Sequence, residues 1–335
     1  MQNQKKEKYI LEDKTIEQML RPKNWDEYIG QEKIKRHLKI MIEAAKKRKE
    51  AMDHILLSGQ AGLGKTTLAY LIAQELEGQI KITSGPALEK MGDIAAVLTN
   101  LEPGDILFID EAHRINRLIE EVLYPAMESR KLHLIIGKGP SARNLAIDLP
   151  PFTLIAATTR ENLLSNPLRS RFGATFRLNF YELNDIIAIL KRSAKILKTK
   201  INDGALNMLA HASRSTPRVA NRLLKRSRDY ALVNNINIIT EKEVEKTLEL
   251  LEIDELGLEP QDRKLIEIII KKFNGGPVGL KTLSAALNED PGVIEDIYEP
   301  YLITLGFIQK TSAGRIVLPA AYKHLKIIKQ GELLE

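Results

Sequence analysis

Short apolar runs alternate with longer segments of helical periodicity through the first half of the chain. The runs HILLSG, IKITS, DILFID and FTLIAATT predict strands over 54–59, 80–84, 105–110 and 152–159. An amphipathic pattern over 31–50 predicts a helix before the first strand, and the helices between strands are expected to begin near Thr66, Gly92 and Leu118. Apolar strands separated by helices are typical of an α/β fold whose parallel sheet is covered on both faces.

Residues 131–149, KLHLIIGKGPSARNLAIDL, interrupt this alternation. Two segments of alternating polarity flank a tip rich in glycine, proline and serine, which predicts a β-hairpin inserted between two units of the sheet.

The second half of the chain has helical periodicity from about 182 to 253. Helices are expected to start at Asn184 (as the N-cap), Asp203, Pro217 and Thr240, where Glu243 completes a capping box. After the acidic linker DELGLEPQD, residues 262–330 predict helices followed by two short strands around a Ser-Ala-Gly turn. That order indicates a winged-helix domain.

These patterns divide the chain into an arm over 1–20 with a helical stretch near 15–20, an α/β domain over 21–181, an all-helical domain over 182–254 and a winged helix over 255–335. The composition adds a net charge of +6, which is compatible with nucleic-acid binding, and no cysteine, which excludes disulfides and Cys-ligated zinc. The charged N-terminus shows no secretory signal and no run is long enough to span a membrane, so a cytoplasmic location is expected.

Residues 59–66, GQAGLGKT, match the phosphate-binding pattern G-x-x-x-x-G-K-[ST] between a predicted strand and a predicted helix. Gly62 and Gly64 permit a tight turn whose N–H groups surround a phosphate. Lys65 is expected to bridge the β- and γ-phosphates of ATP, and Thr66 to place its hydroxyl on Mg²⁺. The alternative is a chance glycine-rich loop, which the strand and helix around it disfavour.

The apolar strand 106–109 is followed by Asp110 and Glu111, which places two carboxylates beside the phosphate loop. Asp110 is expected to hold Mg²⁺ through water and Glu111 to orient and deprotonate the attacking water. Otherwise the pair only starts a loop. His113 is expected to be a structural hydrogen-bonding residue. The spelling Asp-Glu-Ala-His matches a helicase class with two similar lobes, but no second strand-rich lobe follows residue 180.

Positive charge near the γ-phosphate is expected from SNPLRSRFG, residues 165–173. Arg169 and Arg171 are predicted to lie too far round the sheet to reach their own phosphate but to reach a neighbour's, which implies a head-to-tail ring. The alternative is that they pair with local carboxylates. Either Thr158 or Thr159 can hold the attacking water. Arg218 begins a stripe with arginines at 222 and 226, one of which can fold over the nucleotide.

The strings GLGKTTLA, TSGPALEK, NLEPGDILFIDEAHR, EEVLYPAME, DLPPFTLIAATTR, PLRSRFG and STPRVANRLLKRSRD closely resemble the RuvB family, AAA+ motors that drive branch migration of Holliday junctions. The likeness runs from RPKNWDEYIGQ to the wing. It implies a P-loop AAA+ ATPase domain, a helical lid and a winged helix, acting as a DNA helicase with ATP and Mg²⁺ in recombination and repair, including the SOS response. It also implies a homohexamer on DNA, a RuvA partner docking on the 131–149 hairpin, and RuvC in a larger complex.

The resemblance assigns residues position by position. It makes Asp110 and Glu111 the Walker B pair, Thr159 sensor 1, Arg171 the arginine finger and Arg218 sensor 2. The implied nucleotide contacts are Leu20, Arg21, Tyr28, Ile29, Gly62, Leu63, Gly64, Lys65, Thr66, Thr67, Glu128, Ser129, Arg130, Arg171, Tyr181 and Arg218; the implied metal ligands are Thr66 and Asp110, and the implied DNA contacts are Lys310 and Arg315.

The sequence departs from the family pattern at Gln60-Ala61, where prolines are usual, at Ala112, at Ser129-Arg130 and in the wing tip KTSAGR. The leading hypothesis is an ATP-driven DNA translocase. A nucleotide-switched DNA-binding or loading module of the initiator or clamp-loader type is the alternative, and a small-molecule kinase would leave the winged helix unexplained. No base-reading constellation is evident, so binding is expected to be selective for DNA structure rather than sequence.

Overall fold

The computed structural model describes residues 16–136 and 143–327. Most of the expected N-terminal arm and the tip of the predicted hairpin lie outside these residues; a helical stretch is present at 16–20. The chain divides into two compact units, one ending at Tyr181 and the other beginning at Glu182.

A five-stranded parallel sheet forms the centre of the first unit, in the order β2-β3-β6-β1-β7. The strands expected from the sequence are all present, as β1 (Ile55–Ser58), β2 (Ile80–Ser84), β3 (Ile106–Asp110) and β6 (Thr153–Thr158). The sequence patterns missed a further strand, β7 (Ala174–Arg177), which pairs with β1 in the register Ile55↔Ala174. It is a short edge strand with one buried residue, so it lacks the apolar run that marked the others.

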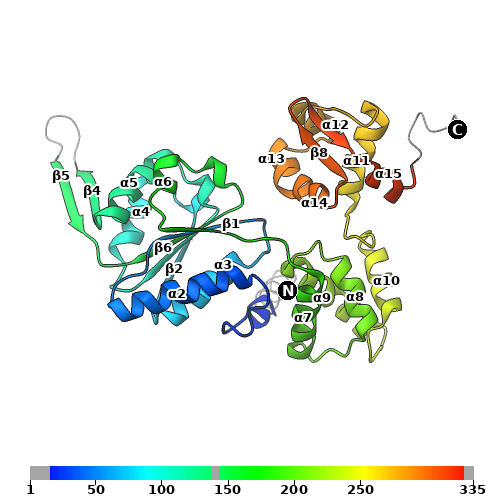
Figure 1. Cartoon of the computed structure of the whole chain (residues 1–335), viewed down its shortest axis with the longest axis horizontal. Helices are drawn as coiled ribbons and strands as arrows, with labels where there is room; N and C mark the ends of the chain where they lie inside the picture. The colour runs from blue at the N-terminus through cyan, green and yellow to red at the C-terminus, as the bar shows by residue number, and fades with distance from the viewer. Residues whose placement is uncertain (1–15, 137–142, 328–335) are drawn as a thin grey trace, which may run out of the picture. The chain divides into compact units, whose positions relative to one another are not determined.

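Helices cover both faces of the sheet (Figure 1). One face carries α2 (Glu32–Arg48) and α3 (Lys65–Glu75), and the other carries α4 (Met91–Thr99), α5 (Arg117–Glu128) and α6 (Asn166–Arg169). The start of α5 is fixed by Asn116, whose side chain accepts from the Ile119 N–H at 3.0 Å. The doubly covered parallel sheet expected from the sequence is therefore confirmed.

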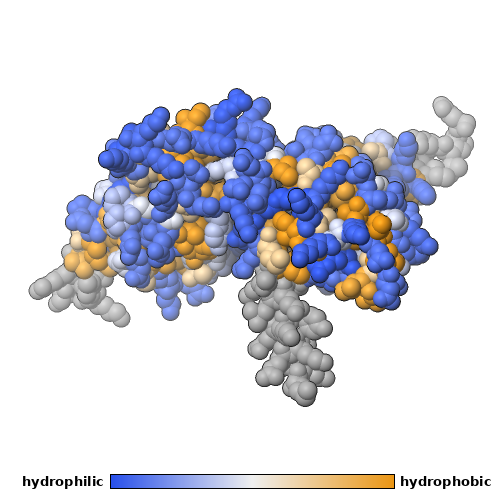
Figure 2. Space-filling model, turned by 90° about the horizontal axis from the view of Figure 1, so that it is seen from below, coloured by the Kyte–Doolittle hydropathy of each residue, from blue (hydrophilic) through white to orange (hydrophobic). Residues whose placement is uncertain are grey.

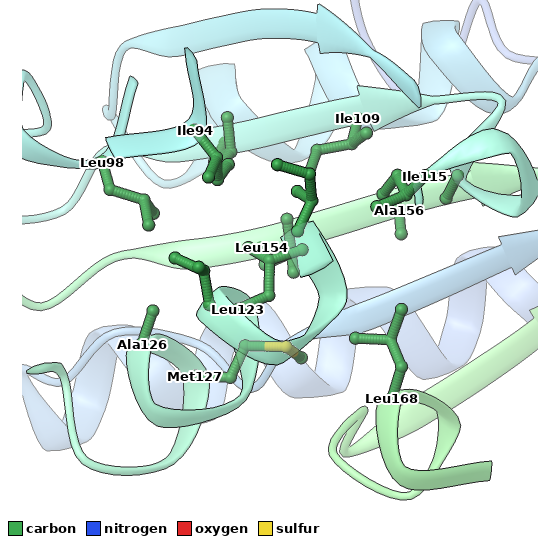
Figure 3. Close-up of a cluster of buried hydrophobic side chains, with 14 of the residues drawn as sticks. Ile94, Leu98, Ile109, Ile115, Leu123, Ala126, Met127, Leu154, Ala156 and Leu168 are labelled. Carbon is green, nitrogen blue, oxygen red and sulfur yellow. The ribbon is translucent and has the colours of Figure 1, made fainter. Parts of the chain in front are cut away.

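The core between the sheet and α4 and α5 is closely packed (Figure 3). Ile94 and Leu98 from α4 and Leu123 and Met127 from α5 lie over Leu154 of β6, and each of these side chains is at least nine-tenths buried. Burial of this kind contributes about 1.5–3 kcal/mol for each large side chain. The strand ends that carry polar residues are thus held on a rigid base.

His54, at the start of β1, is buried in this core and ties three segments together. Its Nδ1 accepts from the Leu154 N–H at 2.8 Å, so its Nε2 carries the proton and donates to the Met127 carbonyl at 3.2 Å. Burial lowers the pKa of His54 from 6.5 to about 4. The neutral ring therefore joins β1, β6 and the end of α5.

The first unit is expected to lose stability in mild acid through His54. Because the folded pKa lies below the unfolded one, this contribution is complete above pH 6.5 and is lost as the pH falls towards 4. The loss should be about 2 kcal/mol at pH 5 and about 3 kcal/mol below pH 4. Urea unfolding at pH 7.5 and pH 5 measures it, with His54→Gln as the comparison. Equal pH dependence in both proteins would assign the acid sensitivity to other groups.

The predicted hairpin between α5 and β6 is present as β4 (Lys131–Ile136) and β5 (Arg143–Asp148), paired antiparallel. Its base is anchored by Leu132 and Leu149, both buried. Arg130 adds to this anchor because its guanidinium donates to the Phe152 carbonyl at 3.1 Å and lies 5.7 Å from the Phe152 ring centroid. The hairpin is thereby joined firmly to the beginning of β6.

The second unit begins with four lid helices, α7 (Leu183–Ile196), α8 (Asp203–His211), α9 (Pro217–Val233) and α10 (Glu241–Leu250). The expected starts at Asp203 and Pro217 are confirmed, as is the capping box of Thr240 and Glu243. The expected N-cap at Asn184 is wrong: the helix starts at Leu183 with Glu182 as N-cap, and no side chain caps it.

The winged helix predicted at the end of the chain is also present. It comprises α11 (Pro260–Phe273), α12 (Leu280–Leu287), a third helix made of α13 (Pro291–Val293), a π-helical turn η5 (Ile294–Tyr298) and α14 (Glu299–Thr304), then β8 (Ile308–Thr311), β9 (Gly314–Val317) and α15 (Pro319–His324). The π-helical turn precedes Pro300, which lacks the N–H that an α-helix would use there.

Among the residues that the structure describes, no helix is long and apolar enough to cross a membrane. Figure 2 shows one face of the molecule, on which hydrophilic side chains predominate and hydrophobic ones form small groups. The mostly hydrophilic face is consistent with the 28% of charged residues in the sequence.

Candidate nucleotide site and nucleic-acid interface

The phosphate loop lies between the end of β1 at Ser58 and the start of α3 at Lys65. Gly62 and Gly64 have φ of 84° and 97°, a conformation that favours glycine. The Lys65 side chain is buried, and its Nζ donates to the carbonyls of Gly59 at 2.7 Å and Gln60 at 2.9 Å. The loop is thus closed around its own lysine, with the N-terminus of α3 directed at the same place. This is a cradle suited to an anion.

Two tyrosines close the loop from behind. The hydroxyl of Tyr181 donates to the Leu63 carbonyl at 3.2 Å and lies 3.3 Å from the Tyr28 hydroxyl. Burial raises the pKa of Tyr28 well above its ordinary value, and the adjacent Tyr181 adds to the effect. A Cβ at Gly64 would lie 2.9 Å from the Tyr28 hydroxyl, so glycine is required there. The chain segments around 28 and 181 therefore meet at the phosphate loop.

The other residues that the resemblance assigns to adenosine lie near the same segment. Leu20 is buried, Ile29 is half-buried, and the Arg21 guanidinium lies 4.4 Å from the Tyr70 ring centroid on α3. The segment is held in place by Gln31, whose Nε2 donates to the Asn179 carbonyl at 2.7 Å. The chain just before α2 therefore packs against α3 and against the chain just after β7.

The acidic pair follows β3, whose last residue is Asp110. Glu111 has a φ of 48°, and its N–H donates to Asp110 Oδ1 at 2.9 Å. A Cβ at Gly85 would lie 2.4 Å from the Glu111 carbonyl oxygen, so a glycine after β2 makes room for this turn. The Glu111 carboxylate is exposed and lies 3.2 Å from Arg114. Within residues 16–136 and 143–327, this weak surface pair is the one ionic contact of the carboxylate.

The two threonines at the end of β6 differ. Thr158 is buried, and its hydroxyl is bonded to His113 Nδ1 at 3.1 Å and to the Arg160 N–H at 3.0 Å. His113 thus holds the Walker B turn against β6, as expected of a structural hydrogen-bonding residue. Thr159, by contrast, lines a cavity of about 570 Å³ next to the phosphate loop.

The same cavity bears on the prediction that Arg169 and Arg171 reach a neighbour's phosphate and not their own. It is lined by Gly59, Gln60 and Thr159 on one side and by Arg169 and Asn179 on the other. Arg169 was expected to lie too far round the sheet for its own site, but the structure places it on the wall of its own subunit's cavity, with its guanidinium hydrogen-bonded to Asn166. The short helix α6 turns its last residue back towards the sheet, which spacing alone does not show.

Arg171 is held elsewhere, against α5. Its guanidinium lies 3.0 Å from Glu128 Oε1, donates to the Pro167 carbonyl at 2.6 Å and lies 4.5 Å from the Tyr124 ring centroid. Its Nε is buried without a hydrogen-bond partner among the described residues. Within one protomer Arg171 therefore pairs with a local carboxylate, the alternative that the sequence left open, and it does not line the cavity beside its own phosphate loop.

The remaining residues predicted to contact the nucleotide lie in both compact units. Thr66 and Thr67 lie half-buried in the first turn of α3, and Glu128 and Ser129 are exposed at the end of α5, while Arg130 is directed into the base of the hairpin. Arg218 lies exposed in the first turn of α9, in the other unit.

The wing places the two predicted DNA contacts differently. Lys310 is half exposed and lies 2.8 Å from Glu295, a hydrogen bond that lowers the pKa of this carboxyl. The side chain of Arg315, by contrast, is 8% exposed and lies 2.6 Å from Glu299 and 3.1 Å from Glu295. Arg315 is at the start of β9, facing the third helix, and neutralises two carboxylates there.

Arg315→Ala and Lys310→Ala are therefore expected to differ in kind. Removing Arg315 leaves the buried Glu299 uncompensated, so the winged helix should lose about 3–5 kcal/mol of unfolding free energy. Removing Lys310 should cost less than about 1 kcal/mol and lower the salt slope of DNA affinity by about one. Chemical unfolding and DNA titration at several salt concentrations measure both. Equal stability of the two variants would contradict the assignment of Arg315 as a buried structural residue.

The phosphate loop, the acidic pair at the end of a neighbouring strand, the helical lid and the central order β2-β3-β6-β1-β7 define a P-loop ATPase of the AAA+ class. Family models match the chain along nearly its whole length: the Holliday junction DNA helicase RuvB P-loop domain over 20–178, the RuvB AAA lid domain over 181–254 and the RuvB C-terminal winged helix domain over 255–326. The chain belongs to the RuvB family.

Solved structures agree with this assignment. The Thermotoga maritima RuvB Holliday junction branch migration motor is similar with a TM-score of 0.86 and 49% identity, over 92% of this chain and 99% of that one. An arginine-to-alanine variant of Thermotoga maritima RuvB is similar with a TM-score of 0.84 and 49% identity, over 92% and 98% of the two chains.

Proposed function

We propose that this protein is an ATP-hydrolysing motor that moves the branch point of Holliday junctions, and that it does so as a ring in which each subunit completes its neighbour's site. The observation that carries the proposal is the separation within one protomer: Lys65, the acidic pair and Thr159 meet at one edge of the sheet, while Arg171 is held against α5. A winged helix in the same chain supplies the DNA-binding element.

In the proposed mechanism the β- and γ-phosphates of ATP enter the loop closed by Lys65. The lysine exchanges its bonds to the Gly59 and Gln60 carbonyls for phosphate oxygens, while the N–H groups at the start of α3 face the same charge. Tyr28 and Tyr181 support the loop on the adenosine side. Binding energy here orients the nucleotide for hydrolysis.

Mg²⁺ would be held by the Thr66 hydroxyl and by Asp110, and when bound it supplies positive charge to the phosphates. Glu111 is the general base for the attacking water, which the Thr159 hydroxyl helps to position. Glu111 suits this role because its carboxylate is exposed and makes only a surface contact. His113 acts indirectly, since it fixes the acidic turn to β6 through Thr158.

The arginine that stabilises the charge of the transition state comes from an adjacent subunit. Arg171 lies 3.0 Å from Glu128, which directly precedes Ser129-Arg130, the pair that the resemblance places at the subunit boundary. Head-to-tail contacts of one kind close into a ring. We assign a homohexamer on DNA to this arrangement. Arg218, in the first turn of α9, is the lid residue that contacts the bound nucleotide in this proposal.

The partners follow from the same proposal. The hairpin of β4 and β5 stands out from the sheet (Figure 1) and carries the exposed Leu145, which suits docking on RuvA, with RuvC joining a larger complex. Lys310 and the exposed Lys323 contact the DNA backbone without reading bases. The cellular role is then recombination and repair.

The test uses purified chain, a synthetic four-way junction and RuvA. The motor is expected to hydrolyse ATP over many cycles in steady state and to convert the junction to duplex products in proportion to the ATP consumed. A loading module would instead hydrolyse about one ATP for each assembly event and then stop. Negative-stain images with DNA and a non-hydrolysable ATP analogue would check the ring, because particles without six-fold rings would contradict the hexamer.

A further inference from the structure

The loop between α8 and α9 has an unusual backbone. Arg214 and Ser215 are consecutive non-glycine residues with φ of 54° and 51°, in the left-handed region that side chains disfavour. Ser213 and Thr216 fix the loop, because both are buried and their hydroxyls donate to the carbonyls of Ala210 and Ser213. A strained conformation that the surroundings hold in place marks a segment with a specific task.

The strained loop directs the Arg214 guanidinium into the winged helix. Its Nη1 lies 3.1 Å from Asp262 Oδ2 and its Nη2 3.4 Å from Asp262 Oδ1, a two-pronged pair with α11. Nη2 also donates to the Ile297 carbonyl of the π-helical turn at 3.2 Å, and the guanidinium carbon lies 4.8 Å from the Tyr301 ring centroid of α14. One lid residue thus holds three segments of the DNA-binding domain.

The pair is buried, which makes it unlike the surface ion pairs of the lid. The Asp262 side chain has no exposure and the Arg214 side chain 12%. Burial raises the pKa of Asp262, and the nearby Arg214 opposes this rise. Arginine suits the position because its planar fork can serve the carboxylate and the Ile297 carbonyl together, which a lysine cannot.

The linker between lid and wing is packed against the same loop. A Cβ at Gly257 would lie 2.3 Å from the Ala212 carbonyl oxygen, and the Tyr301 hydroxyl donates to the Leu256 carbonyl at 2.6 Å. The linker is therefore packed against the lid, and Arg214 adds a buried ion pair with Asp262 of α11, beside the exposed pair of Arg222 with Glu259.

Arg214 also lies between the two ends of the proposed motor. It precedes Arg218, which the proposed function assigns to the nucleotide, by four residues. The helix segments it holds, η5 and α14, carry Glu295 and Glu299, which bind Arg315 and Lys310 of the wing. Together, these contacts form a continuous path from the start of α9 to the wing hairpin.

We propose that Arg214 is a positioning residue that couples the lid to the DNA-binding domain, so that a lid movement driven by the nucleotide moves the wing with it. The proposal rests on the proposed function, since it concerns the same motor. The contacts of Arg214 given above are all with groups of the winged helix. Its role is to keep α11, η5 and α14 fixed to the loop that precedes Arg218.

The test measures the coupling ratio in full-length protein with RuvA. This ratio is defined as the number of junctions converted to duplex products for each ATP hydrolysed. Arg214→Ala is expected to keep DNA-stimulated ATP hydrolysis within about twofold and to lower the coupling ratio at least about tenfold. Lys246→Ala is the matched control, because it removes an exposed lid ion pair with Glu249 that does not reach the wing. It should leave both quantities unchanged.

A merely structural role would give another pattern. The proposal is overturned if Arg214→Ala leaves the coupling ratio unchanged, as happens when hydrolysis and branch migration fall in the same proportion. If Arg214→Ala does not fold, Arg214→Lys provides the same test, since it keeps a cation beside Asp262 but loses the fork. Absence of branch migration in the unmodified protein would contradict the proposed function instead, so the two failures are distinguishable.

A second measurement uses the lack of native cysteine. Spin labels at Glu245→Cys on α10 and Lys272→Cys on α11, both exposed, report the lid-to-wing distance. In the protein with Arg214 the distance distribution should stay narrow and unchanged on adding a non-hydrolysable ATP analogue. It should broaden in Arg214→Lys, and an equally narrow distribution in that variant would overturn the proposal.

Discussion

Glu111→Gln is expected to bind ATP and assemble on DNA but to lose about 10²–10⁴-fold in the rate of hydrolysis. The glutamine keeps the size of the side chain but cannot accept a proton from the attacking water. Little else should change, because the carboxylate is exposed and forms a weak surface pair with Arg114 at 3.2 Å. Single-turnover hydrolysis and nucleotide titration measure the two effects separately.

Glu121→Gln is the matched control, since Glu121 is an exposed glutamate on α5 away from the acidic pair. It should hydrolyse ATP at the normal rate. Branch migration by Glu111→Gln at the normal rate would refute Glu111 as the base and leave the AAA+ fold assignment untouched.

Arg171→Ala is expected to bind ATP normally and to lose about 10³–10⁵-fold in hydrolysis, as when an arginine finger is removed. The loss should be corrected by a neighbour. In rings mixed from Arg171→Ala and Glu111→Gln subunits, the second kind supplies the arginine to intact acidic pairs in the first. Activity of the mixture should therefore exceed the sum of the separate variants.

Arg169→Ala provides the comparison, because Arg169 lines the cavity of its own subunit. Mixing Arg169→Ala with Glu111→Gln should give no such gain, since a neighbour cannot replace a residue of the same site. The unmodified chain should also be tested in a demonstrably monomeric form. If that form hydrolyses ATP at the full rate, Arg171 of an adjacent subunit is not required.

The elements with strong local signals could be predicted from the sequence. The buried strands, the phosphate loop and the capping box of Thr240 each depend on a few adjacent residues, and the structure has them at the expected places. The first lid helix was misplaced because Asn184 resembles an N-cap, whereas the actual N-cap is Glu182, two residues earlier, and no side chain caps the helix. β7 was missed because its pairing with β1, and not its own pattern, makes it a strand.

The direction of individual arginines could not be predicted. Arg169 and Arg171 are two residues apart, yet one lines the cavity and the other stacks on Tyr124. Arg315 lies on a short hairpin strand, and its burial depends on two glutamates of the third helix that its own position does not reveal. Arg214 carried no sequence signal, because its carboxylate partner lies 48 residues away. Such pairs depend on tertiary contacts that spacing does not encode.

The tight packing of Gly257 on Ala212 has a practical consequence for cutting the gene into pieces. A recombinant fragment that starts at Glu182 retains the lid and the winged helix as the compact unit they form here. A fragment that starts at the winged-helix boundary near 255 lacks Arg214, the partner of Asp262. It would therefore expose to solvent a carboxylate that is fully buried in the longer chain. Limited proteolysis should accordingly release the longer piece, and swapping DNA-binding modules between relatives should succeed only when the lid travels with them.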